Sequence, residues 1–98
     1  MMYSIGSKTW PGLSKIAEEF GEVLQVIGKI IGCGGERIHF SGSDLRNDLI
    51  EELADARAAI AYFERVELTA EERAEIADRT RRKFDLFMQW HEGNSDAR

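Results

Sequence analysis

Cysteine, proline and long hydrophobic segments are all scarce in this sequence. Its 98 residues include one cysteine, Cys33, and one proline, Pro11. A single cysteine excludes an intramolecular disulfide framework and a metal site built on a CxxC motif. The sequence has neither an apolar run of about 18 residues, which a transmembrane helix needs, nor the apolar stretch of a signal peptide. We therefore expect a soluble protein of the reducing cytoplasm, with no membrane partner.

Basic residues are also too few for a typical nucleic-acid-binding protein. The chain carries 13 Lys and Arg against 18 Asp and Glu, a formal net charge of −5 at pH 7. Affinity for nucleic acid comes largely from basic contacts to phosphate, so we expect no nucleic acid partner. If such an acidic chain binds a polyphosphate, bridging cations are needed to offset the repulsion.

Three segments with helical periodicity account for most of the chain. Apolar residues recur at steps of three and four in residues 11–31, 44–64 and 69–91, which predicts an amphipathic helix in each. We therefore predict an all-α fold, an antiparallel helical bundle of three long helices with room for a short extra helix in a connector. Apolar stripes on so short a chain favour completion of the core by oligomerisation, as a homodimer or a tetramer.

The remaining segments are polar or rich in glycine. Residues 32–43 form a glycine-rich segment without periodicity, which predicts a flexible loop. Residues 92–98 form a polar tail that we expect to be frayed. The length supports one domain, residues 1–98, with its core at about residues 10–91.

Residues that favour helix starts precede all three predicted helices. Thr9 is a candidate cap for the first helix, and Ser43 or Asp44 for the second. Thr69 followed by Glu72 has the spacing of a capping box at the start of the third helix. These residues support the predicted boundaries.

Two acidic segments, EEFGE at residues 18–22 and EELAD at residues 51–55, lie on the first and second predicted helices. In each segment, carboxylates three residues apart project from one helix face, at the edge of the apolar stripe. Antiparallel packing of the two helices would bring these carboxylates together. Their repulsion favours a divalent cation with oxygen ligands, and Mg²⁺ where phosphates complete the coordination. Solvated glutamate-rich faces are the alternative.

The spelling of these segments resembles a known family. EEFGE followed by EELAD resembles the EExxE…ExxD signature of the MazG-like all-α nucleoside triphosphate pyrophosphohydrolases. The short type often found in phages is most similar, with His39-Phe40 in the loop, DLR at residues 44–46 and FMQWH at residues 87–91. The resemblance covers residues 10–91. It places the expected cytoplasm in a bacterium or in a phage-infected host cell.

The resemblance implies a reaction and a set of metal ligands. Members of the family hydrolyse a nucleoside or deoxynucleoside triphosphate to the monophosphate and pyrophosphate, which controls the nucleotide pool. By resemblance, the residues that bind Mg²⁺, or Mn²⁺ as a substitute, are Glu19, Glu22, Glu52 and Asp55. Glu18 would be a further ligand or a base that orients water.

Four other residues are candidates for contact with the substrate. Arg79 and Lys83 of the third predicted helix resemble the basic positions that the family uses near the phosphates, and cations opposite a polyphosphate make chemical sense. Trp10 could stack on a base. His39 lies on the loop, which could close over the substrate as a lid. The alternatives are a solvated helix face for the two cations and core packing for the tryptophan.

Two rival functions stay open. The first is a non-catalytic helical module for oligomerisation or interaction, whose acidic segments are solvated or merely bind cations. The second is an enzyme that cleaves a modified nucleotide. We expect Lys15 and Lys29 to be surface residues and Cys33 to have no chemical role. The sequence does not mark the base that the nucleotide carries.

Overall fold

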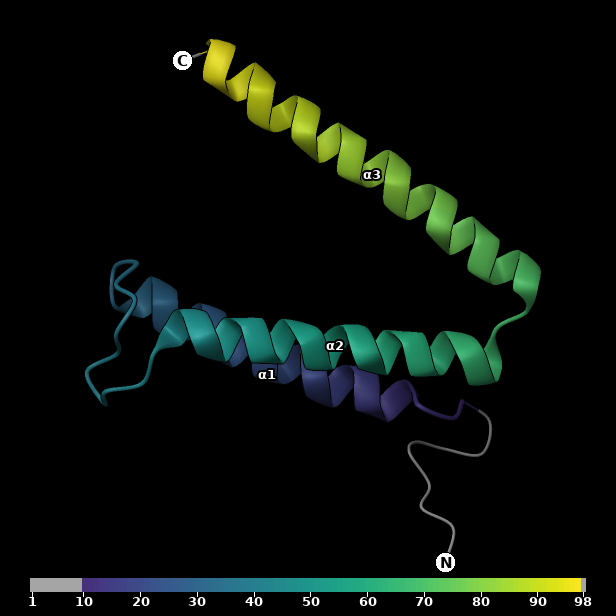
Figure 1. The fold of residues 1–98 in the computed structure, drawn as a ribbon, viewed down its shortest axis with the longest axis horizontal. Helices are drawn as coiled ribbons and strands as arrows, with labels where there is room; N and C mark the ends of the chain where they lie inside the picture. Colours follow the sequence, from purple (N-terminus) through teal and green to yellow (C-terminus); the bar gives the residue numbers. More distant parts are fainter. Residues whose placement is uncertain (1–9, 98) are drawn as a thin grey trace, which may run out of the picture. The chain divides into compact units, whose positions relative to one another are not determined.

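The fold is all-helical, as predicted from the periodicity. The computed structural model describes residues 10–97, which contain α1 (Leu13–Gly32), α2 (Leu45–Glu67) and α3 (Ala70–Ala97) (Figure 1). Within that range there is no β-strand, and the connectors carry no extra helix. The range also holds no helix long and apolar enough to cross a membrane.

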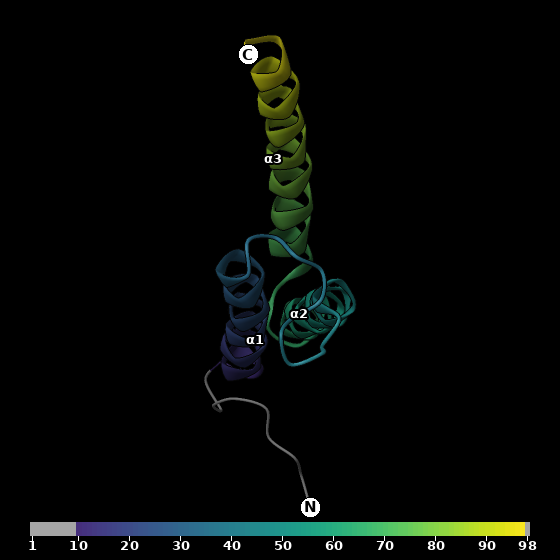
Figure 2. The ribbon, with the colours of Figure 1, turned by 90° about the vertical axis from the view of Figure 1, so that its left-hand side faces the viewer.

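α1 and α2 form an antiparallel pair that lies side by side in both ribbon views (Figures 1 and 2). Among the described residues, the pair belongs to a compact unit that ends at Glu67, and a second unit begins at Leu68. The buried apolar residues of the pair are Val26, Leu45, Ala56 and Ala59. The two alanines carry no side chain beyond Cβ, so the helix backbones can approach closely and bring residues of the two facing surfaces within reach.

α1 starts at a glycine rather than at a side-chain cap. Gly12 occupies the N-cap position with φ 90°, and no side chain caps the helix. A Cβ on Gly12 would lie 2.9 Å from Cδ2 of Tyr62, near the end of α2. Both the left-handed backbone and this contact therefore require glycine. The predicted cap, Thr9, lies outside the described residues.

Gly12→Ala is expected to lower the free energy of unfolding by about 1–3 kcal/mol, because alanine adds backbone strain and displaces the Tyr62 ring. Gly28→Ala is the matched control. Gly28 lies within α1 with open space around its Cα, and alanine there should be neutral or stabilising. Urea denaturation measures both variants. Equal stability of the two variants would contradict the role of Gly12.

The loop before α2 is held by an ion pair. Nε of Arg37 donates to Oδ1 and Oδ2 of Asp44 at 3.0 and 3.1 Å. Asp44 also accepts a hydrogen bond from the backbone N–H of Asn47 at 3.1 Å. Asp44 is therefore the cap of α2, one of the two predicted candidates. The other candidate, Ser43, instead donates a hydrogen bond from its hydroxyl group to the Asp48 carboxylate.

α3 begins with the predicted capping box. The backbone N–H of Thr69 donates to Oε1 of Glu72 at 2.9 Å, and the backbone N–H of Glu72 donates to Oγ1 of Thr69 at 3.1 Å. The helix continues to Ala97, so the predicted end near His91 is wrong. Residues 92–97 keep the helical backbone, and they include no proline, the residue that interrupts the hydrogen-bond ladder most strongly.

Candidate metal-binding site

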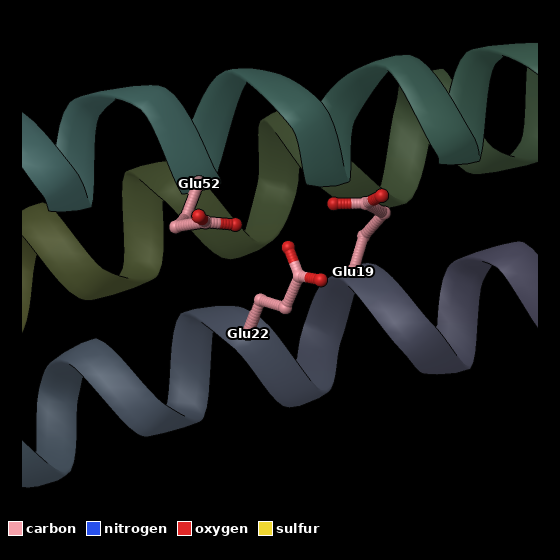
Figure 3. Close-up of side chains that lie close together, drawn as sticks. All are labelled: Glu19, Glu22 and Glu52. Carbon is pink, nitrogen blue, oxygen red and sulfur yellow. The ribbon is translucent and has the colours of Figure 1, made fainter.

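Three glutamates from α1 and α2 meet between the two helices. Glu19 and Glu22 project from α1, and Glu52 projects from α2 toward them (Figure 3). One carboxylate oxygen from each lies within 4.8 Å of the other two. We call these residues the carboxylate cluster. Such convergence provides hard oxygen ligands from two elements at a spacing that one divalent cation can bridge.

Two oxygens of the cluster are buried and lack a hydrogen-bond partner. Glu19 is 7% exposed, and its Oε2 atom has no hydrogen-bond partner. The Oε2 atom of Glu52 is likewise buried without one. A buried acceptor without a partner is destabilising, and a buried carboxylate more so. A cation bound between the carboxylates would satisfy both oxygens, so the donor set fits a divalent metal.

Repulsion within the cluster shifts the protonation of Glu52. The pKa of Glu52 is raised to about 6, above its ordinary value of 4.5. The largest cause is a hydrogen bond with the Glu22 carboxylate, which only the protonated form of Glu52 can donate. Desolvation follows, and then the charges of Glu22, Asp55 and Glu19. Without a cation, Glu52 therefore keeps its proton up to a higher pH than an ordinary glutamate does.

The raised pKa of Glu52 predicts how pH affects the metal-free protein. A proton on Glu52 is held more tightly in the folded state, so the stability it contributes is fully present below about pH 4.5. That contribution is lost as the pH rises through about 6. We expect the thermal midpoint in EDTA to fall over this window for the wild type relative to Glu52→Gln, which resembles the protonated form. A difference between the two proteins that stays constant with pH would contradict this prediction.

Lys15 neutralises one side of the cluster. Its Nζ atom lies 3.2 Å from Oε1 of Glu18 and 3.3 Å from Oε1 of Glu19. Hydrogen bonds to Glu18 and then to Glu19 raise the pKa of Lys15. The expectation that Lys15 is only a surface residue is therefore incomplete. Its spacing of three and four residues from two glutamates is the sequence signal that indicates the contact.

A hollow of about 410 Å³ opens beside the cluster, between the start of α1 and the second half of α2. We call it the Lys15 hollow. Its lining consists of Lys15, Glu19, Asp55, Ala58, Ala59 and Tyr62. The lining thus combines a carboxylate of the cluster with an ammonium group.

The other two predicted acidic residues lie at the edge of the cluster. Asp55 is exposed and lines the Lys15 hollow, but it is not among the three carboxylates that converge. Its charge still acts on Glu52. Glu18 is exposed and hydrogen-bonded to Lys15. Their proposed parts as ligand and water-orienting base stay predictions.

The predicted aromatic and loop candidates have contacts of their own. The ring of Trp10 stacks on Phe63, with centroids 6.4 Å apart and an interplanar angle of 13°. This contact corresponds to the packing alternative for Trp10, although about half of its surface is exposed. On the loop, Nδ1 of His39 accepts a hydrogen bond from the backbone N–H of Ser41 and lies 2.8 Å from Ser41 Oγ. The His39 ring also lies against Phe40.

The predicted phosphate-binding cations lie on α3. Arg79 and Lys83 line a shallow hollow together with Phe84 and Phe87. Both cations are exposed. Their spacing of four residues places them on one face of the helix, as their proposed joint role requires.

Comparison of the chain with protein-family models, with curated proteins and with solved structures finds no match.

Proposed function

We propose that the protein is a MazG-like, divalent-metal-dependent nucleoside triphosphate pyrophosphohydrolase. It would cleave a nucleoside or deoxynucleoside triphosphate to the monophosphate and pyrophosphate, in control of the nucleotide pool of a cytoplasm. The observation that carries the proposal is the carboxylate cluster, with buried oxygens of Glu19 and Glu52 that lack hydrogen-bond partners. The resemblance of EEFGE and EELAD to the family signature supplies the particular reaction.

Each residue of the site has a part in this proposal. Glu19, Glu22 and Glu52 would hold Mg²⁺, and Asp55, which is exposed beside them, would be a fourth ligand. A bound Mg²⁺ would neutralise phosphate charge and lower the pKa of an attacking water. Glu18 would orient that water. The fixed helix pair contributes by placing the ligands before the substrate arrives, so little ordering is needed on binding.

The remaining candidates would contact the substrate. Arg79 and Lys83 neutralise charge on the departing pyrophosphate. Trp10 exposes part of its ring, which could stack on the base. His39 lies on the loop that would close over the nucleotide.

We also propose that the functional protein is a homodimer or a tetramer. An apolar groove of about 670 Å³ lies along the α1–α2 pair, and its large side chains include Phe20, Leu24, Ile50 and Leu53. All four are about half exposed or more. A second copy of this chain would remove them from water through its own equivalent face, as two-fold symmetry allows. Light scattering coupled to gel filtration tests this: a mass of 11.1 kDa across all concentrations would contradict it.

The enzymatic proposal is tested by product identity. We would incubate the wild type with each of the common ribo- and deoxyribonucleoside triphosphates in Mg²⁺ or Mn²⁺, and separate the products by anion exchange. We expect equal amounts of monophosphate and pyrophosphate from at least one substrate, and none in EDTA. If no nucleotide yields pyrophosphate with either metal, the enzymatic proposal is wrong for these substrates, and a panel of modified nucleotides then tests the second rival.

The competing function is a non-catalytic interaction module, which the exposed apolar groove favours. Under that alternative, the wild type self-associates and hydrolyses no nucleotide, whether the carboxylate cluster is solvated or merely binds a cation. A pair of variants separates the two functions. Glu52→Gln alters the cluster, whereas Glu51→Gln alters its exposed neighbour on α2. Only the enzymatic proposal predicts a difference between them in pyrophosphate release.

A further inference from the structure

We infer that Lys15 is a phosphate-binding residue whose ammonium group is held by Glu19 until metal and substrate bind. This inference rests on the proposed function and adds a residue to its substrate site. Lys15 would exchange a carboxylate partner for a phosphate oxygen. The ligand class is a polyphosphate chain, which the Lys15 hollow would accept beside the carboxylate cluster.

The first support is that the two oxygens of the Glu19 carboxylate have different surroundings. Oε1 of Glu19 lies 3.3 Å from Nζ of Lys15. Its Oε2 atom is buried and has no hydrogen-bond partner, and Glu19 belongs to the cluster with Glu22 and Glu52. One carboxylate therefore faces an ammonium group with one oxygen and offers the other to a cation. A divalent cation on Oε2 would weaken the attraction of Glu19 for Lys15, because it reduces the negative charge that the ammonium group experiences.

The second support is the space around Lys15. The Lys15 hollow has a volume of about 410 Å³, within the range of small-molecule sites. Its wall is formed in part by Ala58 and Ala59, whose short side chains leave room above α2. The side chain of Lys15 is 39% exposed, so it can turn without leaving a buried position. The Nζ atom thus has open space next to the proposed metal ligands in which to meet an anion.

The third support is charge. Lys15 is the one basic residue among those that line the hollow, whereas Glu19 and Asp55 are acidic. A polyphosphate that entered without a cation would be repelled by these carboxylates. The ion pairs of Lys15 with Glu18 and Glu19 are partly exposed, and such pairs are weak. Ammonium–phosphate hydrogen bonds are charge-assisted and stronger, so the exchange is favourable once a metal has offset the carboxylates.

The inference predicts opposite effects of one substitution on two ligands. In Lys15→Met, Mn²⁺ alone should bind about threefold more tightly, because the variant lacks the cation that competes for Glu19. Inorganic tripolyphosphate in saturating Mg²⁺ should bind roughly tenfold more weakly, because its ammonium contact is gone. Substitution of a residue that merely stabilised the fold would weaken the binding of both ligands or of neither.

The experiment uses the full chain and two binding measurements. Electron paramagnetic resonance of free Mn²⁺ gives the affinity for metal alone, and calorimetry gives the affinity for tripolyphosphate in Mg²⁺. Lys29→Met is the matched control, because Lys29 is an exposed lysine on the same helix outside the hollow. Lys15→Arg keeps the charge and should retain most of the tripolyphosphate affinity. Circular dichroism confirms that each variant is folded.

The outcomes separate this inference from the proposed function. If the wild type binds no Mn²⁺, both are wrong. If the wild type binds Mn²⁺ and hydrolyses a nucleotide, but Lys15→Met binds tripolyphosphate as the wild type does, only the role of Lys15 is wrong. Weaker binding of both ligands by Lys15→Met, or an equal loss in Lys29→Met, also overturns it. The inference is supported if Lys15→Met binds Mn²⁺ more tightly and tripolyphosphate more weakly than the wild type, and if Lys15→Arg keeps most of the tripolyphosphate affinity.

Discussion

Glu52→Gln is expected to reduce pyrophosphate release by at least about a hundredfold, since even groups that only orient metal ligands matter on that scale. The same substitution should make the metal-free protein more stable at neutral pH. Glutamine keeps the shape of Glu52 and removes the charge that Glu22 and Asp55 repel. Its amide can also donate a hydrogen bond to Glu22, as the protonated carboxyl group does. We therefore expect the activity to fall and the stability of the metal-free protein to rise. This combination is expected when carboxylates that repel one another are needed to bind a ligand.

Steady-state kinetics and thermal melting in EDTA measure the two effects. Glu51→Gln serves as the control, because Glu51 is an exposed neighbour of Glu52 and lies outside the carboxylate cluster. It should change neither quantity appreciably. A Glu52→Gln protein that keeps wild-type activity would contradict a metal-binding role for Glu52. A variant that melts below the wild type in EDTA would contradict the repulsion on Glu52 in the metal-free cluster.

Divalent metal should raise the thermal stability of the wild type strongly. A ligand present at a hundredfold excess over its Kd, and bound only by the folded state, stabilises a protein by about 2.7 kcal/mol. For a chain of this size that corresponds to an increase in Tm of roughly 10 °C. Relief of the repulsion between Glu22 and Glu52 lowers the Kd for the cation, so less metal is needed to reach this excess.

Differential scanning calorimetry with Mn²⁺ or Mg²⁺ measures this increase, and excess EDTA should reverse it. Sodium chloride at matched ionic strength controls for general screening of charge. Glu22→Gln should lose most of the increase, because Glu22 is one of the three converging carboxylates. An equal increase in the Tm of Glu22→Gln and of the wild type would show that the metal binds at another site.

The helices could be predicted from the sequence because their signals are local. Apolar spacing indicated all three, and the caps Asp44 and Thr69 act through hydrogen bonds to residues three positions ahead. The start of α1 could not be predicted in the same way. Gly12 is required there by a positive φ and by the ring of Tyr62, fifty residues away on α2. No local pattern reveals such a contact.

Only part of the candidate site could be predicted, because the packing of the two helices also decides which residues meet. Spacing within each helix indicated the two acidic segments, and antiparallel packing places Glu19, Glu22 and Glu52 together. Spacing alone could not determine that Asp55 would stay exposed at the edge of the cluster, because that depends on how α2 is rotated about its axis against α1. The contact of Lys15 with Glu18 and Glu19 lies within one helix, and the spacing of three and four residues indicates it. The prediction from the two acidic segments did not include it, because it considered only the carboxylates and not their counterion.

Metal binding by the carboxylate cluster is tested most directly by anomalous diffraction from crystals of the wild type soaked in Mn²⁺. We expect a Mn²⁺ peak with carboxylate oxygens of Glu19, Glu22 and Glu52 at roughly 2 Å, the bond length of small divalent cations with oxygen ligands. Glu52→Gln crystals, soaked in the same way, should show a weaker peak or none. A saturated wild-type crystal whose Mn²⁺ peaks all lie away from these three residues would contradict the proposed site.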